Sequence, residues 1–377
     1  MARIARAVVV IPSLLLALAA SGCGEPLVVL GDAPGLMRIV LGIGDSLGTR
    51  VDSVATRTRL TEPRAVAFDA AASLLYAADR GSLRQVAGTT TRVVRIFSIA
   101  SNGRLRLLLD AGGCAQGTCI LEATEMALAP DGTLIIVDAV GSRLFRYAPG
   151  GTLSVLAGTG TAASAPDGTA AAGAPLDRPA GVAVDSDGTI YVSESGAHRV
   201  RMISGGVLTT VAGSGQPGSA GDGGTATAAR LTAPAGLALR DGVLYIAEQG
   251  GHAVRAVEPN GSIRTVAGLG GSPGFAGDGG PATSARLSRP YAVSVSANGR
   301  ALYISDRDND RVRVVDLVTG VIRTFAGTGD RRFTGGRLSA GQTALHEPLG
   351  IDASQAGFVF IADAGHSVIW RTSVGFD

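Results

Sequence analysis

The side chains with the clearest potential for chemistry are histidines, of which the chain has 4. His198, His252 and His366 each follow, by three or four residues, an acidic residue that ends a short apolar run. Three imidazoles form a common zinc ligand set. These three, however, occupy equivalent places in different repeats, so they are expected to lie apart, beyond the roughly 2 Å reach of one ion. We interpret them as structural, and predict no metal and no cofactor.

The acidic residues before the histidines also recur, once in each repeat, and arginines follow them in the next apolar run. A carboxylate and a guanidinium repeated in this way predict charge-assisted hydrogen bonds that close a turn, which is a structural role. The acidic residues are Asp79, Asp138, Glu194, Glu248, Asp306 and Asp363. The Gly-Asp-Gly-Gly loops at 221–224 and 277–280 lack the lysine of a phosphate loop and the spaced carboxylates of a calcium loop.

Positions at which the repeats disagree are better candidates for function. Aligned on a Leu-x-x-Pro element, the fourth residue after the proline is small or apolar in five copies and is Asp352 in the last. A carboxylate there must pair, face water or bind a ligand, because burial alone costs several kcal/mol. Residues beside the proline position also vary, and we expect them to surround one mouth of a central channel. The proposed binding residues are Glu62, Arg64, Glu125, Arg178, Arg289, Tyr291, Glu347 and Asp352. An ordinary solvated rim is the alternative.

The Leu-x-x-Pro element sets the period of the chain. Its prolines, from Pro179 through Pro234 and Pro290 to Pro348, are 55, 56 and 58 residues apart. Pro63 lies two periods before Pro179, and Leu121 with Thr124 in the proline's place fills the gap, which gives six units. Each unit contains four short runs rich in Val, Ile, Leu and Tyr, separated by Asp-Gly, Gly-Gly and Asn-Gly turns. Four antiparallel strands in a repeat of this length predict one blade of a β-propeller.

The two ends of the chain predict how the ring closes. The last unit ends after its third strand, whereas Gly35–Gly42 resembles the fourth-strand segment Gly261–Gly268. An N-terminal strand that completes the last blade would remove both exposed edges. The predicted fold is therefore all-β: a six-bladed β-propeller of four-stranded antiparallel blades over residues 35–377, closed by its N-terminal strand.

Residues 276–313 carry the fullest copy of the repeat, Ala-Gly-Asp-Gly-Gly-Pro-Ala-Thr followed by Leu-Tyr-Ile-Ser-Asp and Arg-Val-Arg. This phrase resembles the NHL repeat family, and the resemblance covers roughly residues 35–377. It implies a six-bladed propeller. It does not specify a function, because related propellers include binding modules, sensor domains and a few enzymes, among them a zinc-dependent amidating lyase and streptogramin lyases.

The N-terminal segment Met1–Gly22 has the pattern of a signal peptide, with Arg3 and Arg6 before an apolar run and small residues before Cys23. Those small residues resemble the lipobox of bacterial lipoproteins, which implies that Cys23 carries lipid and anchors the protein to a cell-envelope membrane. Plain secretion is the alternative. Residues 23–34 would be a short tether, and the propeller would lie on the periplasmic or extracellular side.

The other two cysteines, Cys114 and Cys119, remain as a pair if Cys23 is lipidated, and an exported protein favours a disulfide between them. Without Arg3 and Arg6 the chain has 31 basic and 31 acidic residues. It has no basic stripe and no stacking motif, so we predict no nucleic-acid partner. A monomer is expected. Arg80–Arg92 is an insertion in the first blade, either a partner contact or a surface loop.

The leading hypothesis is a lipid-anchored binding or scaffold protein for a protein, peptide or glycan at the channel mouth. The alternative is an enzyme of the lyase or lactone-hydrolase type that uses the same mouth with assistance from a metal. That class requires converging acid–base groups or metal ligands. The sequence offers carboxylates there, and His346 is the histidine nearest to them.

Overall fold

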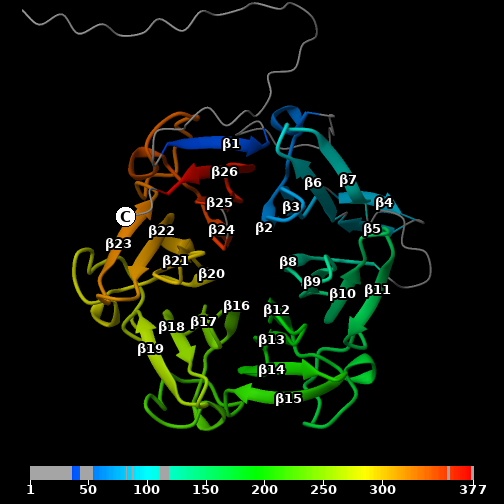
Figure 1. The fold of residues 1–377 in the computed structure, drawn as a ribbon, viewed down its shortest axis with the longest axis vertical. Coiled ribbons are helices and arrows are strands. Elements are labelled where there is room, and N and C mark those ends of the chain that lie inside the picture. The colour runs from blue at the N-terminus through cyan, green and yellow to red at the C-terminus, as the bar shows by residue number, and fades with distance from the viewer. Residues whose placement is uncertain are drawn as a thin grey trace, which may run out of the picture.

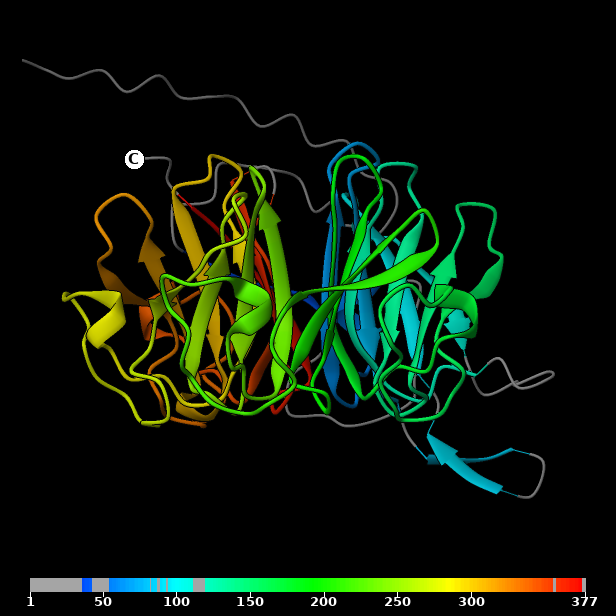
Figure 2. The same ribbon diagram turned by 90° about the horizontal axis from the view of Figure 1, so that it is seen from below.

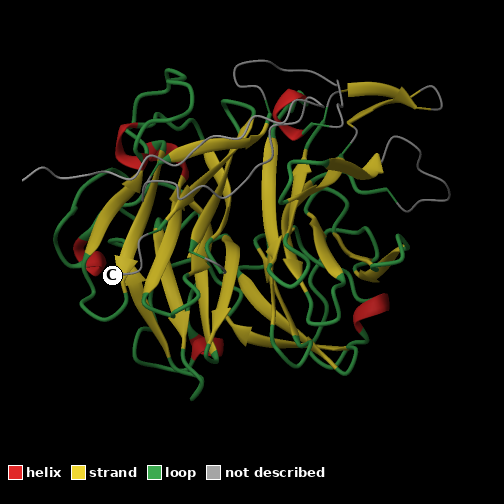
Figure 3. Cartoon of the chain, turned by 45° about the horizontal axis from the view of Figure 1, so that its top comes forward, coloured by secondary structure: helices red, strands yellow, loops and turns green. Residues whose placement is uncertain are grey.

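Six four-stranded antiparallel sheets surround a central axis in the computed structural model (Figure 1). The structure describes residues 36–42, 54–81, 83–86, 89–92, 94–110, 119–354 and 357–374. The predicted signal peptide, the tether, Cys23 and Cys114 lie outside the described residues. The Cys114–Cys119 disulfide therefore stays a prediction. Helix is confined to single 3-10 turns within the described chain (Figure 3), and no helix there is long and apolar enough to cross a membrane.

The blades follow one another along the chain, and each begins with its innermost strand. Blade 1 contains β2 (Pro63–Asp69), β3 (Leu74–Asp79), β6 (Arg95–Ala100) and β7 (Leu105–Asp110). Blade 2 contains β8 (Ala123–Leu128), β9 (Leu134–Asp138), β10 (Arg143–Tyr147) and β11 (Leu153–Ala157). Blade 3 contains β12 (Pro179–Val184), β13 (Ile190–Glu194), β14 (Arg199–Ser204) and β15 (Val207–Ala212).

The second half of the ring repeats this order. Blade 4 contains β16 (Pro234–Arg240), β17 (Val243–Glu248), β18 (Ala253–Val257) and β19 (Ile263–Ala267). Blade 5 contains β20 (Pro290–Val295), β21 (Ala301–Asp306), β22 (Arg311–Asp316) and β23 (Ile322–Ala326). Blade 6 contains β24 (Pro348–Asp352), β25 (Phe358–Asp363), β26 (Val368–Ser373) and β1 (Met37–Leu41).

The N-terminal strand closes the ring as predicted. Strand β1 runs antiparallel to β26, with Met37 opposite Thr372 and Ile39 opposite Trp370. The sheet order β1-β26-β25-β24 makes the first strand of the chain the outermost strand of the last blade. Chain segments far apart in sequence thus share one ladder, so the ring has no free end between blades 6 and 1.

The insertion in blade 1 is a separate two-stranded hairpin. Strand β4 (Leu83–Val86) pairs with β5 (Thr89–Arg92), and neither joins the blade's own sheet. Figure 2 shows this hairpin projecting away from one face of the ring. The blade itself continues from β3 directly to β6, so the insertion leaves the repeat intact.

The hydrophobic core lies between neighbouring blades. One cluster joins Val254 and Val266 of blade 4 to Val293, Leu302 and Ile304 of blade 5, and all five are buried. Alternate residues of a strand face opposite sides of its sheet, and in a propeller each side meets another blade. Both faces of every blade are therefore apolar, which explains why the strands consist mainly of Val, Ile, Leu and Ala.

The strand register corrects the alignment of blade 2 by one residue. In the five other blades a proline that begins the inner strand lies opposite the acidic end of the second strand. In blade 2 the residue opposite Asp138 is Ala123, not Thr124. Glu122 therefore takes the place just before the inner strand, and Glu125 lies two residues inside it.

The recurring acidic residues connect the strands of each blade, and in blades 1, 3, 4 and 5 they pair with an arginine as predicted. Asp79 accepts hydrogen bonds from Arg95 through Oδ2 (3.0 Å from Nε) and from the backbone N–H of Thr61 and Glu62 through Oδ1. In blade 3, Arg201 Nη1 lies 3.0 Å from Glu194 Oε2. Trp370 Nε1 donates to Asp363 in blade 6, where the arginine is missing. Each acid thus fixes the segment that leads into its inner strand.

The three aligned histidines make separate contacts between blades. His198 Nδ1 and His252 Nδ1 accept backbone N–H bonds from Ala233 and Arg289, both at 3.1 Å. His366 contacts Asp363 Oδ2 at 2.8 Å and the Arg331 carbonyl oxygen at 2.9 Å. Each histidine thus supports its own blade junction.

We predict that Arg201→Met lowers the free energy of unfolding by about 3–5 kcal/mol, because it leaves the buried Glu194 carboxylate without its cation. Arg264→Met is the control, since Arg264 pairs with Glu258 at 2.7 Å on the half-exposed outer strand. Its loss should be below about 1 kcal/mol. Urea unfolding followed by circular dichroism measures both, and equal losses would contradict the structural role of the acid–arginine pair.

Candidate functional site

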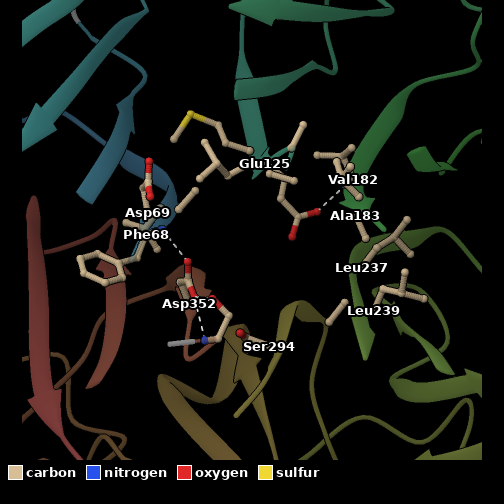
Figure 4. Close-up of a pocket in the computed structure, with 18 of the residues that line it drawn as sticks. Phe68, Asp69, Glu125, Val182, Ala183, Leu237, Leu239, Ser294 and Asp352 are labelled. Carbon is tan, nitrogen blue, oxygen red and sulfur yellow. Dashed lines mark hydrogen bonds between the residues drawn. The ribbon is translucent and has the colours of Figure 1, made fainter. Parts of the chain in front are cut away.

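A cavity of about 830 Å³ lies on the axis of the ring and is lined by all six inner strands (Figure 4). Its wall includes Ala70, Asp131, Ser186 and Ser354, which belong to the turns that follow the inner strands. The cavity therefore extends toward the end of the channel at which the inner strands finish, here called the turn end. The opposite end, where the inner strands begin, is the proline end.

Glu125 is the most unusual residue of the cavity wall. The corresponding positions in the other blades hold only small residues: Ala65, Gly181, Gly236, Ala292 and Gly350. A Cβ atom at Gly181 would collide with the carbonyl oxygen of Ala235, so the inner strands approach one another closely at this level. Glu125 Oε2 accepts the N–H of Val182 at 2.9 Å, and the N–H of Leu237 also bonds the carboxyl group. One side chain of blade 2 thus contacts blades 3 and 4.

Enclosure by protein changes the protonation of Glu125. Loss of solvation raises the pKa of its carboxyl group to about 8, although the two backbone N–H bonds pull the pKa down. At neutral pH the group is therefore mainly a carboxylic acid, which can both accept and donate a hydrogen bond. Part of its surface remains accessible from the cavity.

Asp352 also lines the cavity, from blade 6 (Figure 4). Its Oδ2 accepts the N–H of Phe68 at 2.7 Å, and its Oδ1 accepts the N–H and the hydroxyl of Ser354 at 2.8 and 2.7 Å. Burial raises the pKa of this carboxyl group as well. Ser294 acts similarly one blade earlier, where its Oγ accepts the N–H of Ala353 at 2.9 Å. Asp352 and Ser294 thus bind backbone N–H groups of the following blade.

A network of charged side chains occupies the proline end. Arg64 contacts Glu62 and also Glu122, with Nη1 2.6 Å from Glu122 Oε1. Arg80 Nη1 lies 3.0 Å from Glu62 Oε2. The hydroxyl oxygen of Tyr291 accepts a hydrogen bond from Arg64, and burial raises the pKa of Tyr291 to about 12. The network joins blades 1, 2 and 5.

The remaining proposed residues of this end lie farther from that network. Arg307 Nη2 is 3.6 Å from Glu347 Oε2, and Arg289 Nε is 3.9 Å from Asp308 Oδ2. The carbonyl oxygen of Arg178 accepts the hydroxyl of Ser195. The eight proposed site residues therefore divide into two groups. Glu125 and Asp352 line the cavity, and the other six do not.

Two residues that the sequence argument did not select belong with these groups. Glu122 joins the charged network at the proline end, and Ser294 lines the cavity. Alignment of blade 2 on Asp138 instead of the missing proline would have identified Glu122 and would have shown Glu125 among glycines and alanines. Ser294 was visible as the only hydroxyl in its aligned column.

His346 is not part of the cavity wall. Its backbone N–H donates to Asp363 Oδ1 at 3.0 Å, and its ring packs against that of His366 with centroids 5.6 Å apart. Within the described residues, no three His, Cys, Asp or Glu side chains are grouped so that they could hold a metal ion.

Comparison with known proteins identifies the repeat. The NHL repeat model matches residues 176–201, which run from the end of the blade 2–3 connection to the third strand of blade 3. The chain is an NHL-repeat β-propeller. It is 28% identical over 161 residues to NHL repeat-containing protein 2 of Bos taurus, a match that covers 39% of this chain and 22% of that protein.

A second curated relative is Protein SUPPRESSOR OF QUENCHING 1, chloroplastic, of Arabidopsis thaliana. The identity is 29% over 231 residues, which is 58% of this chain and 21% of the relative. The NHL-repeat chain thus matches only about a fifth of the length of each of these two proteins.

Several solved structures share the fold at low identity. An auxiliary nutrient binding protein from Bacteroides thetaiotaomicron aligns with a TM-score of 0.63 and 14% identity, over 89% of this chain and 75% of the other. A gluconolactonase from Xanthomonas campestris gives 0.52 and 16%, over 84% and 87%. Streptogramin B lyase gives 0.51 and 12%, over 85% and 95%. These likenesses establish the propeller fold and no activity.

We predict that Glu125→Gln removes part of the pH dependence of stability. The folded-state pKa of Glu125, about 8, lies above its ordinary value of 4.5, so its protonated form stabilises the fold. That contribution is complete below about pH 4.5 and is lost as the pH rises through about 8. The glutamine side chain of the variant does not titrate, but its amide can accept only one of the two backbone N–H bonds, so the variant should be less stable at pH 5.5.

Urea unfolding at pH 5.5, 7.0 and 9.0 checks this prediction. The stability difference between the wild type and Glu125→Gln should shrink as the pH rises. Glu258→Gln, on the outer face, is the control and should give a constant difference. A constant difference for Glu125→Gln as well would show that its carboxyl group titrates normally.

Proposed function

We propose that this NHL-repeat propeller is an exported, lipid-anchored binding module whose ligand occupies the axial cavity. The observation that carries the proposal is the cavity itself, about 830 Å³ in volume, into which Glu125 and Asp352 project from two different blades. Sites for small molecules are concave, with a few fixed polar groups on a mainly apolar wall. Here the apolar part comes from residues such as Met126, Val182 and Leu237.

The paired charges at the proline end favour the cavity as the ligand site over that end of the channel, which is the mouth predicted from the sequence. Arg64 and Arg80 are paired with Glu62 and Glu122, and Arg64 also bonds Tyr291. A ligand at that end would compete with ion pairs already formed. The cavity instead has wall atoms that face open space.

Export and anchoring rest on the N-terminal segment. Apolar residues before Cys23 fit a lipoprotein signal, and a neutral mature chain fits a module held at a membrane by lipid alone. The likeness to an auxiliary nutrient binding protein is consistent with a binding role. Incorporation of a palmitate analogue, present in the full chain and absent from Cys23→Ala, is the expected result. Incorporation into both proteins, or into neither, would contradict the anchor.

A second candidate function is an enzyme of the lyase or lactone-hydrolase type in the same cavity. It is favoured by one observation, the position of the Glu125 carboxyl group on the cavity wall, where burial raises its pKa to about 8, a value that suits a general acid or base near neutral pH. Elemental analysis of residues 24–377 tests the metal-assisted form. Stoichiometric zinc or calcium that is lost in Asp352→Ala would favour the enzyme over the binding module.

The cavity is tested by blocking its turn end. Ser186 is exposed and lines the cavity, so Ser186→Cys modified with a fluorescein maleimide should obstruct entry. The unmodified variant is the matched control, and Arg289→Cys with the same label obstructs the proline end. Equilibrium dialysis against a mixture of sugars, amino acids, amines and organic acids, read by mass spectrometry, gives the bound compounds.

We expect retention of at least one compound by the wild type and unmodified Ser186→Cys, and a loss of about tenfold or more after labelling. Labelled Arg289→Cys should bind as the wild type does. Loss of binding only in labelled Arg289→Cys would place the ligand at the proline end and overturn the cavity proposal.

A further inference from the structure

The wall of the cavity is made of the free edges of the inner strands. In every blade the inner strand lies at one edge of its sheet, bonded to a neighbour on one side only. In an antiparallel pair, alternate residues bond the partner strand, and the residues between them direct N–H and C=O away from it. For the inner strands that direction is the channel. The cavity is therefore surrounded by backbone donors and acceptors.

At one level of the channel, two of these N–H groups are satisfied by a side chain of the preceding blade. Phe68 and Ala353 each lie five residues after the proline that begins their inner strand. The N–H of Phe68 bonds Asp352 at 2.7 Å, and that of Ala353 bonds Ser294 at 2.9 Å. Asp352 and Ser294 themselves occupy the same place, four residues after the proline.

In the other four blades that place is alanine. Ala67, Ala127, Ala183 and Ala238 line the cavity and have no acceptor atom in their side chains. The N–H groups of the following blades, at Leu128, Val184, Leu239 and Val295, therefore receive no bond of the Asp352 type. Val184 lies opposite Ile190 and Leu239 opposite Leu244, the same register as Phe68 opposite Leu75.

This difference divides the cavity into two arcs. The arc of blades 6 and 1 has its N–H groups satisfied by Asp352 and Ser294. The arc of blades 2–5 presents N–H donors above Glu125, whose carboxyl group already accepts Val182 and Leu237 one level deeper. On the arc of blades 2–5, oxygen atoms of a ligand can accept the N–H groups, as Asp352 and Ser294 do on the arc of blades 6 and 1.

The charges around the cavity restrict the class of ligand. Asp69, Asp131 and Asp185 line its turn end, and each uses Oδ1 to accept the N–H of a nearby turn residue. Arg240 also lines the cavity, with Nε 3.4 Å from Asp241. An anionic ligand would meet these carboxylates. A cation could not accept from the N–H groups of blades 2–5. A neutral hydroxyl group fits both kinds of wall group, since it donates hydrogen bonds to carboxylates and carbonyls and accepts them from N–H groups.

We propose that the ligand of this cavity is a neutral saccharide, held on the arc of blades 2–5. Its oxygens accept the N–H groups of Val184, Leu239 and Val295, and its hydroxyls donate to inner-strand carbonyls and to the turn-end aspartates. The inference rests on the proposed binding function and assigns its ligand class.

A groove beside the cavity allows a ligand longer than one sugar ring. It has a volume of about 290 Å³ and shares Asp131 and Ser186 with the cavity wall. Arg146 and Asp187 line its outer part, between blades 2 and 3. This groove continues from the arc of blades 2–5, so an oligosaccharide can extend along it while its end ring lies in the channel.

Isothermal titration calorimetry tests the ligand class with glucose and maltotriose, and with putrescine and gluconate as cationic and anionic comparators. The key variant is Ala183→Ser/Ala238→Ser, which gives Leu239 and Val295 the acceptor that Ser294 gives Ala353. We expect a saccharide to bind the wild type, and binding to the double variant to be about tenfold weaker, since two neutral hydrogen bonds are lost. Ala180→Ser is the matched control, on the same inner strand but outside the cavity wall.

The inference is overturned if neither saccharide binds, if putrescine or gluconate binds more tightly, or if the double variant binds saccharide as well as the wild type does. Its failure is distinct from failure of the proposed function. A compound that is retained in dialysis and excluded by the label on Ser186→Cys keeps the binding cavity, whatever its class. Thermal melting of the double variant, expected at or above the wild-type temperature, confirms that weaker binding does not come from unfolding.

Discussion

The buried acidic residue at the end of each second strand is the interaction on which the rest of the propeller depends. In blade 1, one oxygen of Asp79 accepts hydrogen bonds from the backbone N–H groups of the segment that enters β2. The other oxygen accepts a hydrogen bond from Arg95 of β6. A single carboxylate thereby sets where the inner strand begins relative to the second and third strands. An arginine joins the acid in blades 1, 3, 4 and 5. In every blade the acidic residue accepts the backbone N–H two residues before the inner strand, so the six inner strands begin at one level of the axis, with one register. The alignment of their free edges around the cavity follows from it.

Close approach of the inner strands is the second constraint. Glycine or alanine occupies the level of Glu125 in the five other blades, since a side chain at Gly181 or Gly350 would collide with the backbone of the next blade. Blade 2 alone carries a long side chain at this level, and its carboxyl group reaches the two following blades. The polar chemistry of the cavity therefore comes mainly from backbone groups, modified by Glu125, Asp352 and Ser294.

The period, the number of blades and the closing strand could be predicted from the sequence because each depends on local patterns of apolar residues and turns. Blade 2 could not be aligned correctly, since it lacks the proline, and Thr124 was chosen where the ladder places Ala123. The cavity was missed for another reason. Its position depends on which end of the channel is filled by paired charges, such as Arg64 with Glu122, and those pairs join blades that are separate in sequence. Residue types do not reveal backbone N–H groups that face a cavity, except where alanine stands at a position that holds a side-chain acceptor in another blade.

Glu125 connects the fold to the chemistry of the cavity. An ionised carboxylate enclosed between the inner strands would cost several kcal/mol, and two backbone N–H bonds offset only part of that cost, which is why the pKa of Glu125 rises to about 8. The neutral acid keeps both acceptor contacts and adds a donor that can face the cavity. A group that donates and accepts, placed below backbone N–H and C=O, complements hydroxyl groups better than it complements either a cation or an anion. Titration of Glu125 would change both properties together, because the same proton that stabilises the inner strands supplies a hydrogen-bond donor at the cavity wall.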